Sequence, residues 1–116
     1  MPIPILAIVL AAAVAGAAPP APGAETVIPF VNSGGVLDWQ AAGDRSLYVR
    51  GYNGRWYLVR TMNVCPHLRD AVTLGFRASG IDQLDRHGAI IAEGEHCPVD
   101  SVIAAAPPPS RHPHRR

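Results

Sequence analysis

Two cysteines and two histidines are the residues whose types and spacing could do chemistry in this chain of 116 residues. Cys65-Pro66-His67 and His96-Cys97 supply two thiols and two imidazoles, which are the ligands that zinc binds in tetrahedral sites. Adjacent residues on a strand point to opposite faces, however, so His96 and Cys97 do not easily share one ion. An even number of cysteines in an exported protein indicates a disulfide instead, and the apolar, uncharged start of this chain is typical of an exported protein. We therefore expect a Cys65–Cys97 disulfide. The alternative is a metal or small-ligand site made of His67, His96 and nearby acids.

The predicted disulfide has a sufficient structural purpose. It would close a loop of about 33 residues, which removes roughly 3–4 kcal/mol of unfolded-state freedom in the chain-entropy model. The body of the chain, residues 25–103, holds only 79 residues. A domain of this size has a thin core and often depends on a covalent cross-link.

Closely spaced carboxylates are the other candidates for chemistry. Asp82 with Asp85, and Glu93 with Glu95, could act as acid–base pairs, but all four lie in predicted turns, where acids are usually solvated. The chain has no Gly-rich phosphate loop, no nucleophile elbow and no His-Glu-x-x-His motif. We therefore expect a non-enzymatic protein without a cofactor, and an enzyme of unknown type is the second alternative.

The composition excludes some partners. The chain has ten Arg, no Lys and nine acidic residues, which give a formal net charge of +1. This balance excludes a nucleic-acid binder that relies on neutralising phosphates. Hydrophobic residues make up 48% of the chain and charged residues 16%, which indicates a folded domain.

The beginning of the chain is typical of an exported protein. Residues 1–24 carry no charged side chain, and the apolar run Ile5–Ala15 has the length of a signal-peptide core. Ala15-Gly16-Ala17 is a small-x-small cleavage site, so we expect a signal peptide at 1–17 and a linker at 18–24, although no Lys or Arg stands near the start. The apolar stretch is shorter than the roughly 20 residues of a membrane span. The protein should therefore be periplasmic or secreted, with no transmembrane span after cleavage. An uncleaved anchor is the alternative.

The end of the chain differs from the body. Residues 104–116 contain four Pro, three Arg and two His, and no apolar residue larger than Ala except Pro. Such a segment cannot bury a core, so we expect a disordered tail.

The clearest local structural signal is a β-hairpin. Ser46–Arg50 and Arg55–Arg60 are rich in aromatic and β-branched residues, and Asn53-Gly54 lies between them. Asn-Gly is typical of a two-residue type I′ loop, because both residues accept a positive φ. This loop pairs Tyr52 with Arg55 and Arg50 with Tyr57.

The predicted pairing assigns the side chains of the hairpin to two faces. One is the expected core face, with Leu47, Val49, Trp56 and Leu58. The other holds all three Tyr of the chain and two Arg, residue types that are frequent at binding surfaces. We therefore expect a candidate binding face made of Tyr48, Arg50, Tyr52, Arg55 and Tyr57.

Further strand-length runs are bounded by Gly, Pro, Asn or Asp. They lie at residues 26–31, 36–40, 71–76, 88–92 and 98–103. Runs of this length and spacing predict an all-β domain over 25–103, with a small antiparallel sheet that curls into a barrel or a sandwich.

Most of the body is similar to a family of small exported bacterial proteins with an uncharacterised domain. The matching strings include Asp44–Gly51, Gly54–Val59, Cys65-Pro66-His67-Leu68 and His96–Val102. The family pattern has Gly at the position of His67 and often carries further cysteines. The resemblance implies secretion or periplasmic residence and a disulfide, and it implies no activity. We therefore expect an exported, non-enzymatic domain of binding or envelope-associated role, with an envelope protein as its partner.

Overall fold

The computed structural model of the protein describes residues 21–109. The predicted signal peptide and residues 110–116 of the predicted tail lie outside the described residues. Between 21 and 109 there is no helix long and apolar enough to cross a membrane. The regular elements of this part of the chain are β-strands, and their bounds are β1 Ile28–Pro29, β2 Val36–Ala41, β3 Ser46–Gly51, β4 Trp56–Thr61, β5 Leu74–Arg77, β6 Gln83–Leu84, β7 Ala89–Ala92 and β8 Glu95–Ala105.

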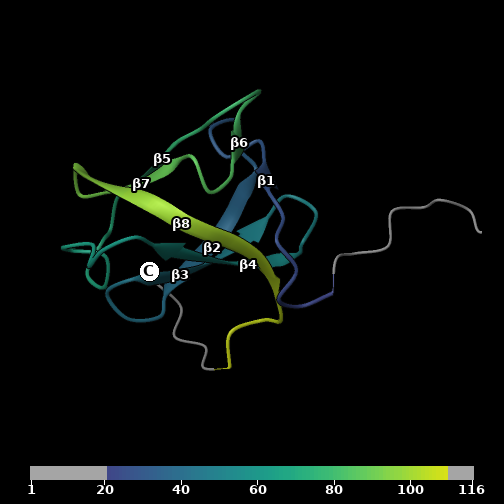
Figure 1. Cartoon of the computed structure of the whole chain (residues 1–116), viewed down its shortest axis with the longest axis horizontal. Helices are drawn as coiled ribbons and strands as arrows, with labels where there is room; N and C mark the ends of the chain where they lie inside the picture. The colour runs from purple at the N-terminus through teal and green to yellow at the C-terminus, as the bar shows by residue number, and fades with distance from the viewer. Residues whose placement is uncertain (1–20, 110–116) are drawn as a thin grey trace, which may run out of the picture.

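Six of these strands form one antiparallel sheet in the order β2-β3-β4-β8-β7-β5. The sheet curls into a half-barrel, and the short pair β1-β6 lies at one end of it (Figure 1). The prediction of an all-β domain with a small curled antiparallel sheet is therefore confirmed.

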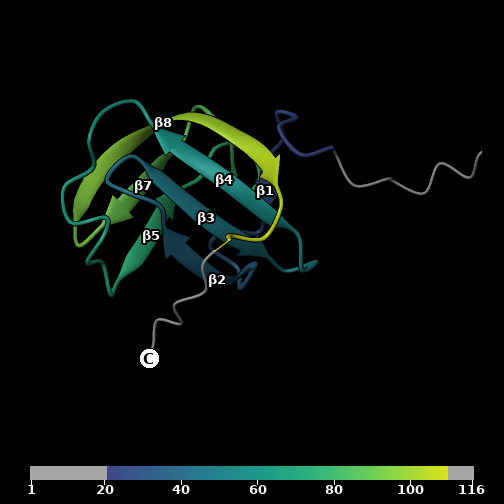
Figure 2. The same ribbon diagram turned by 90° about the horizontal axis from the view of Figure 1, so that it is seen from below.

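Strand β8 holds the two halves of the sheet together. Its first half pairs with β7 and its second half pairs with β4, so the strand bends between them (Figure 2). The register shifts where Arg60 and Thr61 of β4 face Ser101 and Val99, which leaves Asp100 as an extra residue. A bulge of this kind bends a strand and changes which residues face the core. Apolar side chains consequently point inward on both sides of it, at Cys97, Val99, Val102 and Ala104.

Backbone hydrogen bonds before residue 25 and the end of β8 after residue 103 extend the sheet on both sides of the range 25–103. Before it, Gly23 N–H donates to the carbonyl of Ala104 at 2.7 Å, and Thr26 N–H donates to that of Val102 at 3.0 Å. Residues 23–26 thus pair with the second half of β8, along the edge where β7 does not reach. After residue 103, β8 continues to Ala105 and the side chain of Pro108 is buried.

The register of the β3–β4 hairpin differs by one residue from the prediction. Leu47 pairs with Val59, and Val49 pairs with Tyr57, which leaves a loop of three residues instead of two. Gly54 has a φ of 82°, and its N–H donates to the carbonyl of Gly51 at 2.9 Å. Asn53 is not among the residues with positive φ, which a type I′ turn would require. The loop is therefore the three-residue type in which a turn is followed by a left-handed glycine.

A one-residue shift exchanges the two faces of a strand. Tyr57 is only 3% exposed and packs in the core, whereas Trp56 and Leu58 lie on the opposite side with half-buried side chains. The physical reason is found at Gly51, where an added Cβ would lie 3.0 Å from a ring carbon of Tyr57. The missing side chain leaves room for the aromatic ring on the core side. The predicted core positions of Trp56 and Leu58 are thus wrong, as is the placement of Tyr57 on the binding face.

The two-residue loop with two positive φ values occurs in the other hairpin. Ala92 pairs with Glu95, and the residues between them, Glu93 and Gly94, have φ values of 51° and 84°. This is the backbone that a type I′ turn requires. A turn was predicted here, but Glu-Gly carries a weaker signal for this geometry than Asn-Gly.

Candidate functional site

The side of the β2-β3-β4-β8 layer that points away from the core is the candidate site, and we call it the outer face. The cross-strand register defines its members as rows of facing residues. One row runs from Asp38 through Arg50 and Trp56 to Ala105, the next from Gln40 through Tyr48 and Leu58 to Ile103, and the third from Ser46 through Arg60 to Ser101.

The outer face combines apolar and charged side chains. The rings of Tyr48 and Trp56 meet edge to face, with centroids 6.5 Å apart and an interplanar angle of 79°. Leu58 extends this apolar strip, and the exposed Arg50 and Arg60 flank it on either side. Trp, Tyr and Arg are the residue types that most often anchor protein interfaces.

The five residues of the predicted binding face do not lie on one surface in the structure. Tyr48 and Arg50 lie on the outer face, whereas Tyr52 is in the hairpin loop, where its ring meets Phe30 edge to face at 5.3 Å. Arg55 pairs with Gly51 on the side of the core, and Tyr57 is part of the core. Trp56, Leu58 and Arg60 were missed. The glycine at the end of the first strand was the signal that could have indicated the correct register.

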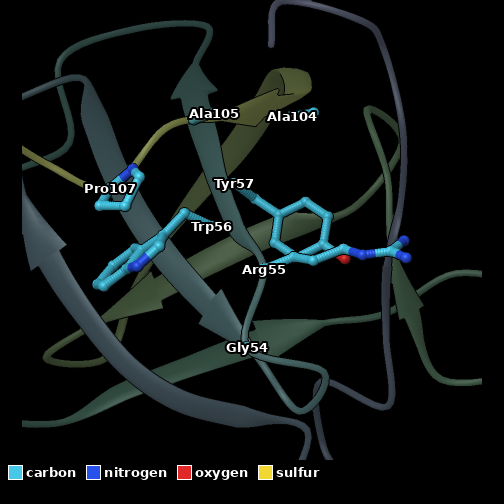
Figure 3. A pocket seen from close by; sticks show the side chains of 7 residues that line it. All are labelled: Gly54, Arg55, Trp56, Tyr57, Ala104, Ala105 and Pro107. Carbon is cyan, nitrogen blue, oxygen red and sulfur yellow. The ribbon is translucent and has the colours of Figure 1, made fainter. Parts of the chain in front are cut away.

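One pocket opens at the end of the outer face, where β4 begins and β8 ends. Its volume is about 220 Å³, which is below the roughly 300–1,000 Å³ of small-molecule sites. Trp56 and Pro107 lie on one side of it and Tyr57 with Arg55 on the other (Figure 3). Apart from the guanidinium of Arg55, the hydroxyl of Tyr57 and the indole N–H of Trp56, the side-chain groups that line this pocket are apolar.

The predicted Cys65–Cys97 disulfide is present. The two Cα atoms are 5.6 Å apart, within the usual range for a bridge, and the residues are 1% and 4% exposed. The bond ties the long connection between β4 and β5 to the first half of β8. Since both sulfurs are bonded to each other, they are not thiolate ligands for a metal.

The two histidines of the alternative metal site are exposed. His67 lies in the connection after β4 and His96 lies on β8 opposite Ile91. Among residues 21–109, no group of three or more His, Cys, Asp or Glu is placed to hold a metal ion. The geometry of this part of the chain therefore does not support a metal site at the two histidines.

The candidate acid–base carboxylates are engaged in different turns. Glu93 Oε2 accepts hydrogen bonds from the backbone N–H of Val72 and of Thr73, both at 2.8 Å. Asp85 Oδ1 accepts from the hydroxyl of Ser79 at 2.7 Å and from the backbone N–H of His87 at 2.8 Å. These bonds lower the pKa of both carboxyl groups, as expected for ionised acceptors. Their structural purpose is to hold loops.

We expect Glu93→Gln to destabilise the protein at neutral pH and to have progressively less effect in acid. The hydrogen bonds from Thr73 and Val72 lower the pKa of Glu93, so its contribution to stability is complete above the ordinary value of 4.5 and is lost as the pH falls through the lower folded-state pKa. Urea denaturation between pH 7 and pH 2.5 measures this. A difference between wild type and variant that stays constant over this range would contradict the assignment.

His67 has a φ of 69°, a left-handed conformation that costs roughly 1–2 kcal/mol for residues other than Gly. Its side chain is exposed. We expect His67→Gly to raise the free energy of unfolding by up to about 1 kcal/mol, because glycine relieves this strain. The matched control is His67→Ala, which keeps the strain and should give no gain in urea denaturation. A loss of stability in both variants would show that the imidazole itself is needed.

The family comparison covers nearly the whole chain. Residues 1–106 match the family described as "Family of unknown function (DUF6491)", in agreement with the similarity to an uncharacterised domain that the sequence indicates. Neither the curated proteins nor the solved structures contain a significant match to the chain. On the strength of the match over residues 1–106, the chain belongs to DUF6491, a family of unknown function.

Proposed function

We propose that the protein is an exported, non-enzymatic domain that binds another protein of the cell envelope through its outer face. The observation that carries this proposal is the apolar strip of Tyr48, Trp56 and Leu58 between two exposed arginines. Along a strand with one solvated face, apolar side chains on the core side should alternate with polar side chains on the solvent side. Strand β4 instead places apolar side chains on both of its faces.

Export is supported by two independent features. The start of the chain has the pattern of a signal peptide. The buried Cys65–Cys97 bridge is of the kind that persists in oxidising compartments and is rare in the cytosol. Intact-mass analysis of the protein recovered from the periplasm should show the loss of about 17 residues, as cleavage after Ala17 requires. Recovery of the full-length chain from the cytosol would contradict export.

The outer face is suited to a protein partner rather than to a small molecule. Its half-buried apolar members Tyr48, Trp56, Leu58, Ile103 and Ala105 lie in two adjacent rows that cross β3, β4 and β8, and the pocket at its end is small. Protein interfaces have an apolar centre with aromatic anchors and a polar rim, often with Arg. The outer face has this arrangement, with Arg50 and Arg60 as rim residues.

The test combines photo-crosslinking in cells with a measured affinity. A photoreactive residue at Leu58 should capture a partner that mass spectrometry identifies, whereas the same residue at Ile81, a 91% exposed position in the turn before β6, should not. With the purified partner, the double variant Arg50→Ser with Leu58→Ser should bind at least about tenfold more weakly, the effect of losing interface anchors. Unchanged affinity with an unchanged melting temperature would leave the outer face as scaffold and overturn the proposal.

A further inference from the structure

We propose that the outer face binds an extended acidic segment of its partner, in which two carboxylates four residues apart flank a large apolar side chain. The inference rests on the proposed function and names the chemistry of the ligand for the same outer face. Arg50 and Arg60 are the groups that hold the two carboxylates, and the apolar strip between them receives the apolar side chain.

Positive charge is concentrated in the hairpin that builds the centre of the outer face. Residues 45–60 contain four arginines, at intervals of five residues, and no acidic residue. The rest of residues 21–109 contains three arginines and all nine acidic residues of the chain. The hairpin is therefore strongly positive on a domain that is otherwise negative. Charge separated in this way attracts an acidic ligand and orients it towards the hairpin.

Arg50 and Arg60 have no partner for their charge in the part of the chain that the structure describes. Both side chains are exposed on the outer face. Within residues 21–109 an ion pair joins Arg86 to Glu25 at 3.6 Å, and neither Arg50 nor Arg60 has an ion pair or a side-chain hydrogen bond. A ligand can thus engage both guanidinium groups without breaking a contact. The planar fork of arginine matches a carboxylate with two parallel hydrogen bonds.

One acidic residue belongs to the rows of the outer face. Asp38 faces Arg50 across β2 and β3, and its carboxylate accepts a hydrogen bond from the backbone N–H of Trp39 at 2.8 Å. Strand β2 is an edge of the sheet, so Asp38 borders the face on one side and leaves the surface over β3 and β4 to the arginines. Its negative charge should weaken the binding of an acidic ligand, which gives the proposal a further test.

The rows of the outer face determine the spacing within the ligand. Arg50 lies in the row of Trp56, and Arg60 follows Trp56 by four residues on β4. At about 3.3 Å per residue, these two rows are roughly 13 Å apart. In an extended segment the side chains at positions i, i+2 and i+4 point to one side and cover the same length. Carboxylates at i and i+4 therefore reach the two arginines, and the side chain at i+2 lies over the middle row, at Tyr48 and Leu58.

The apolar strip favours a protein segment over a simple anion. Inorganic phosphate would pair with an arginine but would leave Tyr48, Trp56 and Leu58 in contact with water. An aromatic or large aliphatic side chain between the two carboxylates covers this strip and adds the affinity of apolar burial to that of the exposed charge pairs, which are weak by themselves.

The experiment titrates the full chain with the peptide Gly-Ser-Asp-Ser-Phe-Ser-Asp-Ser-Gly and follows binding by NMR. The peptide should shift the indole N–H signal of Trp56. It should bind at least about tenfold more tightly than the same peptide with Asn in place of both Asp, because that change removes both charge pairs. A peptide of unchanged composition in which the two Asp are neighbours should also bind more weakly, since it reaches one arginine at a time. Equal affinities of the three peptides would overturn the proposal.

Substitutions in the chain test the same contacts. Arg50→Ala with Arg60→Ala should weaken binding of the Asp peptide at least about tenfold, whereas Arg77→Ala, at an exposed arginine of β5, should leave it unchanged. Asp38→Asn should strengthen binding about threefold, because a repulsive charge is lost. Arg50→Glu with Arg60→Glu should instead bind the peptide in which Arg replaces both Asp, which also shows that this variant is folded. An equal loss in Arg77→Ala and in the double Ala variant would refute the site.

Three further outcomes separate this proposal from the proposed function. If the Asp peptide binds as expected but the photoreactive residue at Leu58 captures no envelope protein, the acidic-segment site stands and the proposed function fails. If Leu58→Ser abolishes binding of the captured partner while Arg50→Ala with Arg60→Ala does not, the outer face remains a protein-binding surface and the acidic ligand is refuted. Binding to vesicles that contain phosphatidylglycerol, without binding to the Asp peptide, would assign the arginines to a lipid surface and overturn the proposal.

Discussion

Tyr57→Ala should lower the free energy of unfolding by about 3–5 kcal/mol, whereas Leu58→Ala should lower it by only about 1 kcal/mol. The two residues are adjacent on β4, but the Tyr57 ring is in the core above Gly51 and the Leu58 side chain is half-buried on the outer face. Deletion of a buried aromatic ring leaves a cavity in addition to the lost burial, and deletion at the outer face does not. Urea denaturation followed by tryptophan fluorescence measures both variants.

The control for this prediction is Tyr57→Phe. It removes only the hydroxyl, which accepts a hydrogen bond from the side-chain amide of Asn53 at 3.4 Å, so its cost should be at most about 1 kcal/mol. The register predicted from the sequence, with a two-residue loop at Asn53-Gly54, would place Leu58 in the core and Tyr57 outside. With that register, Leu58→Ala would be the more destabilising of the two substitutions. A larger loss for Leu58→Ala than for Tyr57→Ala would therefore show that the observed register is wrong.

Removal of the disulfide is the second change with a large expected effect. The double variant Cys65→Ala with Cys97→Ala should be less stable by about 2–5 kcal/mol, since the bridge spans 32 residues of sequence and restricts the unfolded chain. A typical total stability is about 5–15 kcal/mol, so the loss is a large share for a small domain. The connection between β4 and β5 should lose the most local stability, because Cys65 is one of the buried residues that hold it against the sheet.

Two observations distinguish the bridge from a packing effect of the cysteines. Reduced wild-type protein and the double variant should unfold at the same urea concentration, since both lack the cross-link. Alkylation of native protein without a reductant should label neither Cys. Free labelling of both thiols would contradict the disulfide, and a reduced protein as stable as the oxidised one would contradict its contribution to stability.

The sequence by itself determined the type and approximate place of most elements. Runs of aromatic and β-branched residues between Gly, Asn and Pro predicted strands at or near the observed β2, β3, β4, β7 and β8, because these signals act within a few residues. The Cys65–Cys97 pair followed from the cysteine count together with the predicted export. Strand β6 was not predicted, since Gln83–Leu84 is only two residues long and exists through its pairing with β1, which lies far away in the sequence.

The composition of the outer face was decided only by the tertiary structure. Side chains alternate with a period of two, so a loop of three residues instead of two moves Tyr57 into the core and brings Trp56 and Leu58 out. The choice depended on how the Tyr57 ring packs over Gly51, which is a contact between two strands and not a property of the turn residues. The bulge at Asp100 and the position of Pro107 beside Trp56 also depend on contacts between separate segments of the chain. Each results from packing between segments that lie apart in the sequence, and local patterns carry no information about that.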